Sequence, residues 1–153
     1  MDTNPTPTPI PDWRTRPDAY LPEARDGVRA LLLDDDPLDV ALVSRLAPRS
    51  SQFAISLTSC RTVEEASVAL SKQAFDILFV DYWLGLNTSI GFIHEQTQSK
   101  GAPCVLLTGL DVPDVRRCAF RAGVAGYLAK DDLSIQAIEG VMSAVLARRQ
   151  SLA

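Results

Sequence analysis

Residues 28–39 read VRALLLDDDPLD, an apolar run that ends at three consecutive acidic residues. Short runs rich in Val and Leu are typical of strands buried on both faces of a parallel sheet. Asp36 followed by Pro37 indicates a helix start, because aspartate caps free N–H groups and proline fits the first helical position. We therefore predict a strand at Val28–Leu33, an acidic turn, and a helix from Pro37 with Asp36 acting only as its cap.

The same strand and helix pattern recurs four more times. The further strands are predicted at Ala54–Ser59, Phe75–Val80, Pro103–Thr108 and Gly126–Ala129. The helices are predicted at Pro37–Ala47, Val63–Lys72, Ile90–Gln98, Val112–Ala122 and Leu133–Arg149. A capping box at Thr62 and Glu65 supports the second helix, and Gly123 and Gly126 should lead from the fourth helix into the last strand. The pattern predicts an α/β fold, a doubly wound five-stranded parallel sheet with strand order 2-1-3-4-5.

The chain of 153 residues is long enough for one well-buried domain. Residues 1–27 contain six of the ten prolines, and this composition buries too little apolar surface to offset its ordering entropy. We predict a flexible proline-rich arm at residues 1–27, a folded domain at residues 28–149 and a short tail at residues 150–153.

The charge and the apolar pattern exclude several classes of partner. The formal net charge is -4 and the basic residues are scattered, so direct binding of nucleic acid is not expected. No apolar run approaches the ~20 residues of a membrane span, and the N-terminal residues show no basic region followed by an apolar stretch, so neither membrane insertion nor export is expected. Cys60, Cys104 and Cys118 are far apart without metal-ligand spacing, so we interpret them as small buried hydrophobic residues in a reducing cytoplasm.

Polar side chains stand at the carboxyl ends of the predicted strands, where open α/β sheets place their sites. They are Asp34, Asp35, Asp81, Thr108 and Lys130. The predicted strand order makes the first and third strands neighbours, so the three carboxylates should converge. Two carboxylates ~4 Å apart repel by about 4 kcal/mol near a protein surface. A cation must offset this repulsion, and Mg2+ suits a few carboxylates together with phosphate oxygens.

Asp81 is the natural nucleophile of such a site. A carboxylate can attack phosphorus to form an aspartyl phosphate, and it has no proton to lose, so no general base is required. Lys130 can neutralise a phosphoryl oxygen and the Thr108 hydroxyl can donate a hydrogen bond to one. The residues therefore predict phosphoryl transfer to Asp81 with Mg2+ as the cofactor.

Four segments resemble the signature regions of response-regulator receiver domains, in the order of that family. They are LLLDDDPLD (residues 31–39), FDILFVDYWL (75–84), VLLTG (105–109) and GYLAK (126–130). The resemblance implies the flavodoxin-like, three-layer receiver fold over about residues 28–149. It also implies a cytoplasmic phosphoacceptor switch, which assists its own phosphorylation and dephosphorylation and is not otherwise an enzyme. A sensor histidine kinase or a histidine phosphotransfer protein would supply the phosphoryl group to Asp81.

The resemblance assigns a role to each matching position. Asp35 and Asp81 would bind Mg2+ directly, Asp34 through water, and Trp83 through its backbone carbonyl. Thr108 would be the switch hydroxyl, and Tyr127 the aromatic switch that turns inward when Thr108 moves toward the phosphate. Residues 112–149 would form the output surface for a partner or a homodimer. We expect no output domain after them, and therefore output by protein binding.

The chain departs from the family pattern at several loop positions. Asp131 follows Lys130 where many receivers have a proline in a cis peptide, so we expect a trans bond and a more mobile loop. Gly85 and Ser89 stand where proline and glycine are common, and Trp83 is bulky for its position. The loop geometry after Asp81 is therefore left open.

Three other functions fit parts of the same pattern. A receiver-like module could keep the acidic rim and bind partners without being phosphorylated. A haloacid-dehalogenase-type phosphatase would use Asp34 as nucleophile and Asp36 as acid, but it needs a strand after the lysine and Thr or Val at the position of Leu38. A flavodoxin-type flavin binder shares the fold, but an acidic loop repels an anionic cofactor. His94, the sole histidine, is interpreted as a surface residue.

Overall fold

The computed structural model describes residues 26–109 and 112–151. Within these ranges five parallel strands form the main sheet, in the order β2-β1-β3-β6-β7. The strands are β1 (Asp26–Leu33), β2 (Phe53–Cys60), β3 (Ile77–Asp81), β6 (Cys104–Thr108) and β7 (Gly126–Ala129). Because β6 and β7 are the fourth and fifth strands of the sheet, the predicted order 2-1-3-4-5 is confirmed.

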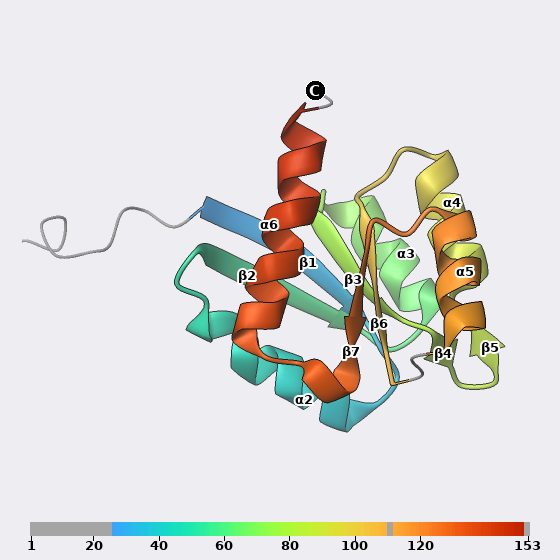
Figure 1. The fold of residues 1–153 in the computed structure, drawn as a ribbon. Coiled ribbons are helices and arrows are strands. Elements are labelled where there is room, and N and C mark those ends of the chain that lie inside the picture. Colours follow the sequence, from blue (N-terminus) through green and yellow to red (C-terminus); the bar gives the residue numbers. More distant parts are fainter. Residues whose placement is uncertain (1–25, 110–111, 152–153) are drawn as a thin grey trace, which may run out of the picture.

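Helices cover both faces of the sheet (Figure 1). Helices α2 and α6 pack on one face, and α3, α4 and α5 pack on the other. Their bounds are α2 (Pro37–Leu46), α3 (Val63–Lys72), α4 (Ile90–Gln98), α5 (Pro113–Ala122) and α6 (Ile135–Ser151). None of the helices in these ranges combines the length and apolar composition needed to cross a membrane. The predicted three-layer α/β architecture is therefore confirmed.

Each strand contributes side chains to two separate cores. Leu33 and Val80 pack beneath α3, α4 and α5, whereas Leu32 and Phe79 pack beneath α2 and α6. Burial on both faces explains why the central strands β3 and β6 are nearly continuous apolar runs, whereas the edge strand β2 alternates. Each such side chain contributes about 1.5–3 kcal/mol on burial, so the sheet holds the strand ends firmly in place.

The predicted side-chain caps of α2 and α3 are both present, and the cap of α3 differs from a standard capping box in one hydrogen bond. The Asp36 carboxylate accepts a hydrogen bond from the Leu38 N–H at 2.9 Å, which confirms its capping role. Thr62 Oγ1 accepts from the Glu65 N–H at 3.1 Å, as in a capping box. The Glu65 carboxylate accepts in return from the N–H of Arg61, one residue before the cap. The predicted starts of α2 and α3 therefore rest on side-chain caps.

The ends of the domain differ from the predicted bounds. Strand β1 begins at Asp26, so residues 26–27 of the predicted arm pair with β2; residues 1–25 lie outside the described residues. Helix α6 begins at Ile135 rather than Leu133, because the 3-10 turn Lys130–Asp132 and an extended Leu133 precede it. It continues through Ser151, into the predicted tail, whose residues 152–153 are not described.

The glycine predictions are confirmed, and one cysteine prediction is wrong. Gly123 ends α5 with a φ of 101°, and Gly126 is the first residue of β7, as in the predicted strand Gly126–Ala129. A Cβ at Gly126 would come within 2.8 Å of the Val141 side chain, so the glycine allows α6 to approach β7. Cys60 and Cys104 are buried as expected, whereas Cys118 is exposed on α5.

A short hairpin that was not predicted follows β3. Strands β4 (Trp83–Leu84) and β5 (Asn87–Thr88) pair antiparallel around a two-residue turn. Gly85 opens the turn with a φ of 63°, a backbone conformation that favours glycine. The hairpin lies beyond the carboxyl end of β3 (Figure 1) and forms one border of the rim where the strands end.

Candidate functional site

Strand register brings the predicted carboxylates together. Leu33 pairs with Val80, so Asp34, directly after β1, and Asp81, the last residue of β3, reach the rim side by side. Carboxylate oxygens of Asp34, Asp35 and Asp81 all lie within 4.8 Å of one another. The predicted convergence of three carboxylates at the carboxyl ends of neighbouring strands is confirmed.

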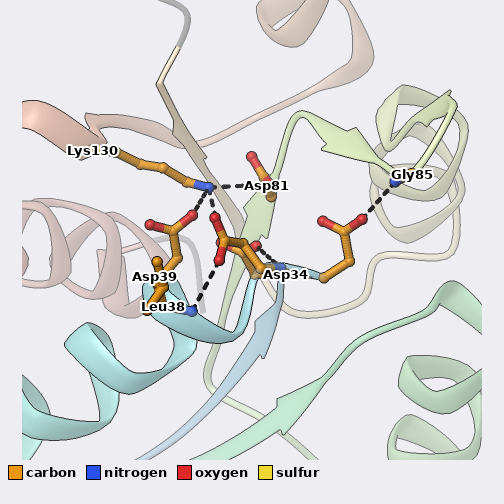
Figure 2. A network of polar contacts seen from close by, with 8 residues as sticks. Asp34, Leu38, Asp39, Asp81, Gly85 and Lys130 are labelled. Carbon is orange, nitrogen blue, oxygen red and sulfur yellow. Dashed lines mark hydrogen bonds and ion pairs between the residues drawn. The ribbon is translucent and has the colours of Figure 1, made fainter.

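Lys130 reaches the same cluster from β7, the strand at one edge of the sheet. Thr108 pairs with Ala129, and Lys130 follows directly after β7. Its ammonium nitrogen lies 3.0 Å from Asp34 Oδ2 and 3.2 Å from Asp81 Oδ2, as Figure 2 shows. The lysine thus supplies the cationic partner expected for the carboxylates, and it contacts the predicted nucleophile directly.

Asp39 is a member of the site that sequence reasoning missed. Its Oδ2 lies 2.5 Å from the Lys130 ammonium, on the α2 side of the cluster (Figure 2). Asp39 stands in the first turn of α2, where acidic residues are common because they favour the positive end of the helix dipole. The signal that could have revealed it is position: the first turn of α2 starts at the same rim as the strand ends.

The two neighbouring aspartates after β1 have different environments. Asp34 is fully buried, and its Oδ1 accepts a hydrogen bond from the Asp36 N–H at 2.9 Å. Its Oδ2 faces Lys130 but accepts no hydrogen bond. Asp35 is exposed, and its Oδ2 accepts from the Gly85 N–H at 2.7 Å, so it anchors the β4–β5 hairpin beside the rim. One oxygen of each aspartate is therefore held by a backbone N–H.

Burial and charge raise the proton affinity of the predicted nucleophile. Burial raises the pKa of Asp81 to about 7, the charge of Asp34 adds to the rise, and Lys130 opposes it. Burial also raises the pKa of Asp34. Burial alone would lower the pKa of Lys130, but its hydrogen bond to Asp39, its close contact with Asp34 and the charge of Asp81 outweigh burial and raise it. Lys130 therefore stays charged, but its single positive charge does not offset the negative charges of the carboxylates around it.

The donor set suits a hard divalent cation. The cluster offers carboxylate oxygens from Asp34, Asp35 and Asp81, which are the ligand type that Mg2+ and Ca2+ prefer. A divalent cation would also relieve the unfavourable charge that raises the pKa of Asp81. The residues present therefore fit the metal that the sequence predicts.

The predicted switch residues lie on the two neighbouring strands β6 and β7. Thr108 ends β6 and is buried, and Tyr127 lies in β7 opposite Leu106. Tyr127 is half-buried, and the Arg116 guanidinium of α5 lies 4.6 Å from the centre of its ring. A coupled movement of Thr108 and Tyr127 stays a prediction.

The remaining loop predictions have mixed outcomes. No peptide bond among the described residues is cis, so the bond between Lys130 and Asp131 is trans as expected. Trp83 is 44% exposed in β4 and its ring packs edge-on against Tyr82, with centroids 5.3 Å apart. That the backbone carbonyl of Trp83 binds a metal ion stays a prediction. His94 is exposed on α4, as expected for a surface residue.

Comparisons with known proteins identify the fold through structure and not through sequence. No protein-family model matches this sequence. No curated protein matches it either. The solved structures that match include response-regulator receiver domains, which align with most of the chain.

Three of these structures illustrate the similarity. A response regulator from Burkholderia pseudomallei is 20% identical, with a TM-score of 0.67 over 81% of this chain and 71% of that one. The signal receiver domain of a modulated diguanylate cyclase from Desulfovibrio desulfuricans G20 is 18% identical, with a TM-score of 0.72 over 84% and 100%. A chemotaxis protein from Vibrio cholerae is 20% identical, with a TM-score of 0.66 over 78% and 98%. This chain therefore has the fold of response-regulator receiver domains.

Proposed function

We propose that the chain is a phosphoacceptor response regulator of two-component or phosphorelay signalling, phosphorylated on Asp81. One observation carries the proposal: Lys130 lies 3.2 Å from Asp81 at a rim that also gathers Asp34 and Asp35. A nucleophilic carboxylate beside a buried ammonium and a cation site is an arrangement suited to phosphoryl transfer. The fold of response-regulator receivers supports the same function.

The transfer step requires little of the protein beyond positioning and charge. A carboxylate oxygen of Asp81 forms a bond to phosphorus while the bond from phosphorus to the donor nitrogen breaks. The electron pair of that bond stays on the imidazole of the phosphohistidine donor, which then takes a proton from solvent. Lys130 stabilises the negative charge on the phosphoryl oxygens, and Thr108 donates a hydrogen bond to one of them.

We propose Mg2+ as the cation. Asp35 and Asp81 would bind it directly, Asp34 through water, and Trp83 through its backbone carbonyl. When bound, Mg2+ neutralises phosphoryl oxygens and so favours the transfer. The response regulator from Burkholderia pseudomallei holds a calcium ion and a phosphorylated aspartic acid, which supports an oxygen-ligand cation and an aspartyl phosphate in this fold.

The signal would pass to a partner protein. Phosphorylation replaces the single negative charge of the Asp81 carboxylate by the charge of about -1.5 to -2 of a phosphoryl group, so the site becomes more negative by up to about one unit. Thr108 would turn toward the phosphate and Tyr127 would move inward, which changes the surface of residues 112–149. We propose that this surface binds a partner or a second copy of the chain, and that the donor is a sensor histidine kinase or a histidine phosphotransfer protein in the cytoplasm.

The rival phosphatase is disfavoured by topology. A haloacid-dehalogenase-type enzyme needs a further strand after the lysine, whereas here residues 130–132 form a 3-10 turn and α6 begins at Ile135. The nucleophile of that enzyme would be Asp34, which is fully buried behind Lys130. Asp81 is also buried, but its side chain is 11% exposed where that of Asp34 is 0% exposed, so Asp81 is the better placed carboxylate.

Phosphorylation from a small acyl phosphate tests the proposal. Wild type, Asp81→Asn and Asp114→Asn are incubated with acetyl phosphate and Mg2+, and their intact masses are measured. Asp114 is a suitable control because it is an exposed aspartate on α5, paired with Arg117. We expect one phosphoryl group on wild type and on Asp114→Asn, and none on Asp81→Asn. Absence of an adduct on wild type, or an equal adduct on Asp81→Asn, would instead indicate a binding module that is not phosphorylated.

A further inference from the structure

The Lys130 ammonium is shared among three carboxylates. It lies 2.5 Å from Asp39, 3.0 Å from Asp34 and 3.2 Å from Asp81. The contact with Asp39 is a hydrogen bond, whereas those with Asp34 and Asp81 are ion pairs. A phosphoryl group on Asp81 would add another anionic partner around the same ammonium, so it would compete with these carboxylates for Lys130.

The three carboxylates differ in how easily they can release the lysine. Asp34 and Asp81 end adjacent strands, and their side chains are only 0% and 11% exposed. Asp39 stands on the first turn of α2, and its side chain is 24% exposed, so water can replace Lys130 as its partner. Asp39 also lies outside the trio of carboxylates that could hold a metal ion together. It is therefore the partner that a phosphoryl group would displace.

We propose that Asp39 is a positioning residue that holds Lys130 toward α2 and competes with the phosphoryl group for its ammonium. The proposal rests on phosphorylation of Asp81. In the unphosphorylated protein Asp39 shares the positive charge of Lys130 with Asp34 and Asp81, which leaves these two carboxylates freer to bind a cation. After phosphorylation Asp39 weakens the hold of Lys130 on the phosphoryl oxygens and adds a nearby negative charge.

Removal of the Asp39 charge should consequently have opposite effects on two binding equilibria. Asp39→Asn should weaken Mg2+ binding, because a negative charge is lost and Lys130 pairs more closely with the metal ligands. The same variant should bind a phosphoryl mimic more tightly, because Lys130 is released. We expect the dissociation constant for Mg2+ to rise and that for the phosphoryl mimic to fall, each by about three- to fivefold, because the ion pair is partly exposed. If Asp39 had only a structural role, the variant would bind both Mg2+ and the phosphoryl mimic more weakly.

Calorimetric titrations measure the two affinities separately. Mg2+ is titrated alone, and beryllium fluoride, a tetrahedral mimic that attaches to a carboxylate oxygen, is titrated at saturating Mg2+. Asp36→Asn is the matched control: it removes the same charge from the start of the same helix, where Asp36 caps α2 through the Leu38 N–H. Asparagine also caps helices well, so this control should fold normally. Circular dichroism checks that each variant retains its helices.

The outcomes separate this inference from the function on which it rests. Weaker Mg2+ binding with tighter beryllium fluoride binding in Asp39→Asn, beyond the changes in Asp36→Asn, supports the role of Asp39. If Asp39→Asn matches Asp36→Asn, or loses both affinities, Asp39 does not compete for Lys130. If wild type binds no beryllium fluoride, or Asp81→Asn binds it equally well, phosphorylation of Asp81 itself is wrong.

Discussion

The buried carboxylate of Asp81 should make the metal-free protein less stable as the pH rises. Its pKa is raised from 3.8 to about 7, first by burial and then by the charge of Asp34. Between these two values the folded chain keeps a proton that the unfolded chain releases. Stability therefore falls as the pH rises from about 4 to about 7, and the loss is complete above the folded pKa. Asp81→Asn replaces the carboxyl by a neutral group of the same shape and should remove most of this loss.

The size of the effect follows from the pKa. A rise from 3.8 to about 7 corresponds to about 4 kcal/mol at pH 8, at 1.36 kcal/mol for each pH unit. The pKa of about 7 already includes the lowering effect of Lys130, so the contact with Lys130 needs no separate correction to this free energy. Asp34, whose pKa is also raised by burial, keeps some pH dependence in the variant. We therefore expect Asp81→Asn to be more stable than wild type by about 2–4 kcal/mol at pH 8 in the absence of divalent cations.

Urea unfolding followed by circular dichroism measures this difference. Wild type, Asp81→Asn and the exposed control Asp114→Asn are unfolded at pH 5 and pH 8 in a chelator, and again at pH 8 with saturating Mg2+. Wild type and the control should lose stability from pH 5 to pH 8 and regain it with Mg2+, whereas Asp81→Asn should change much less. Equal stability of wild type at both pH values, with no gain in Asp81→Asn at pH 8, would refute the reasoning.

Further variants test other contacts of the fold by the same urea unfolding. Lys130→Met leaves the surrounding carboxylates without their lysine and should cost about 3 kcal/mol in a chelator, part of which Mg2+ restores. Glu139→Gln should cost about 1 kcal/mol, because the buried Glu139 carboxylate accepts three hydrogen bonds from the segment before β2. Gly123→Ala should destabilise by more than 1 kcal/mol, since its φ is 101° and the Cβ would lie 2.5 Å from Thr97. Gly140→Ala, in open space on α6, should instead stabilise by about 0.5–1 kcal/mol.

The sheet and the core of the site could be predicted because their signals are local. Runs such as Ile77–Val80 are apolar at every position, which indicates strands buried on both faces. Once these strands are parallel and ordered, their carboxyl ends must meet at one rim. Asp34, Asp81 and Lys130 therefore come together as a consequence of topology, although they are far apart in the sequence.

The features that were missed depend on tertiary contacts. Strands β4 and β5 have two residues each, too few to show a hydrophobic period, and the hairpin is held in part by the hydrogen bond from Gly85 to Asp35. The role of Asp39 depends on Lys130, which is 91 residues away in the chain. The exposure of Cys118 depends on which face of α5 packs on the sheet. None of these contacts leaves a pattern in the local sequence.

Localisation of the phosphoryl group tests the central claim most directly. Wild-type protein is phosphorylated with acetyl phosphate and Mg2+ and then reduced with borohydride, which converts an aspartyl phosphate to homoserine. Tandem mass spectrometry of its peptides should find homoserine at position 81, and the conversion should disappear when a chelator replaces Mg2+. Homoserine at position 34 or 35 instead, or unmodified aspartate at all three positions, would contradict the assignment of Asp81 as the phosphoacceptor.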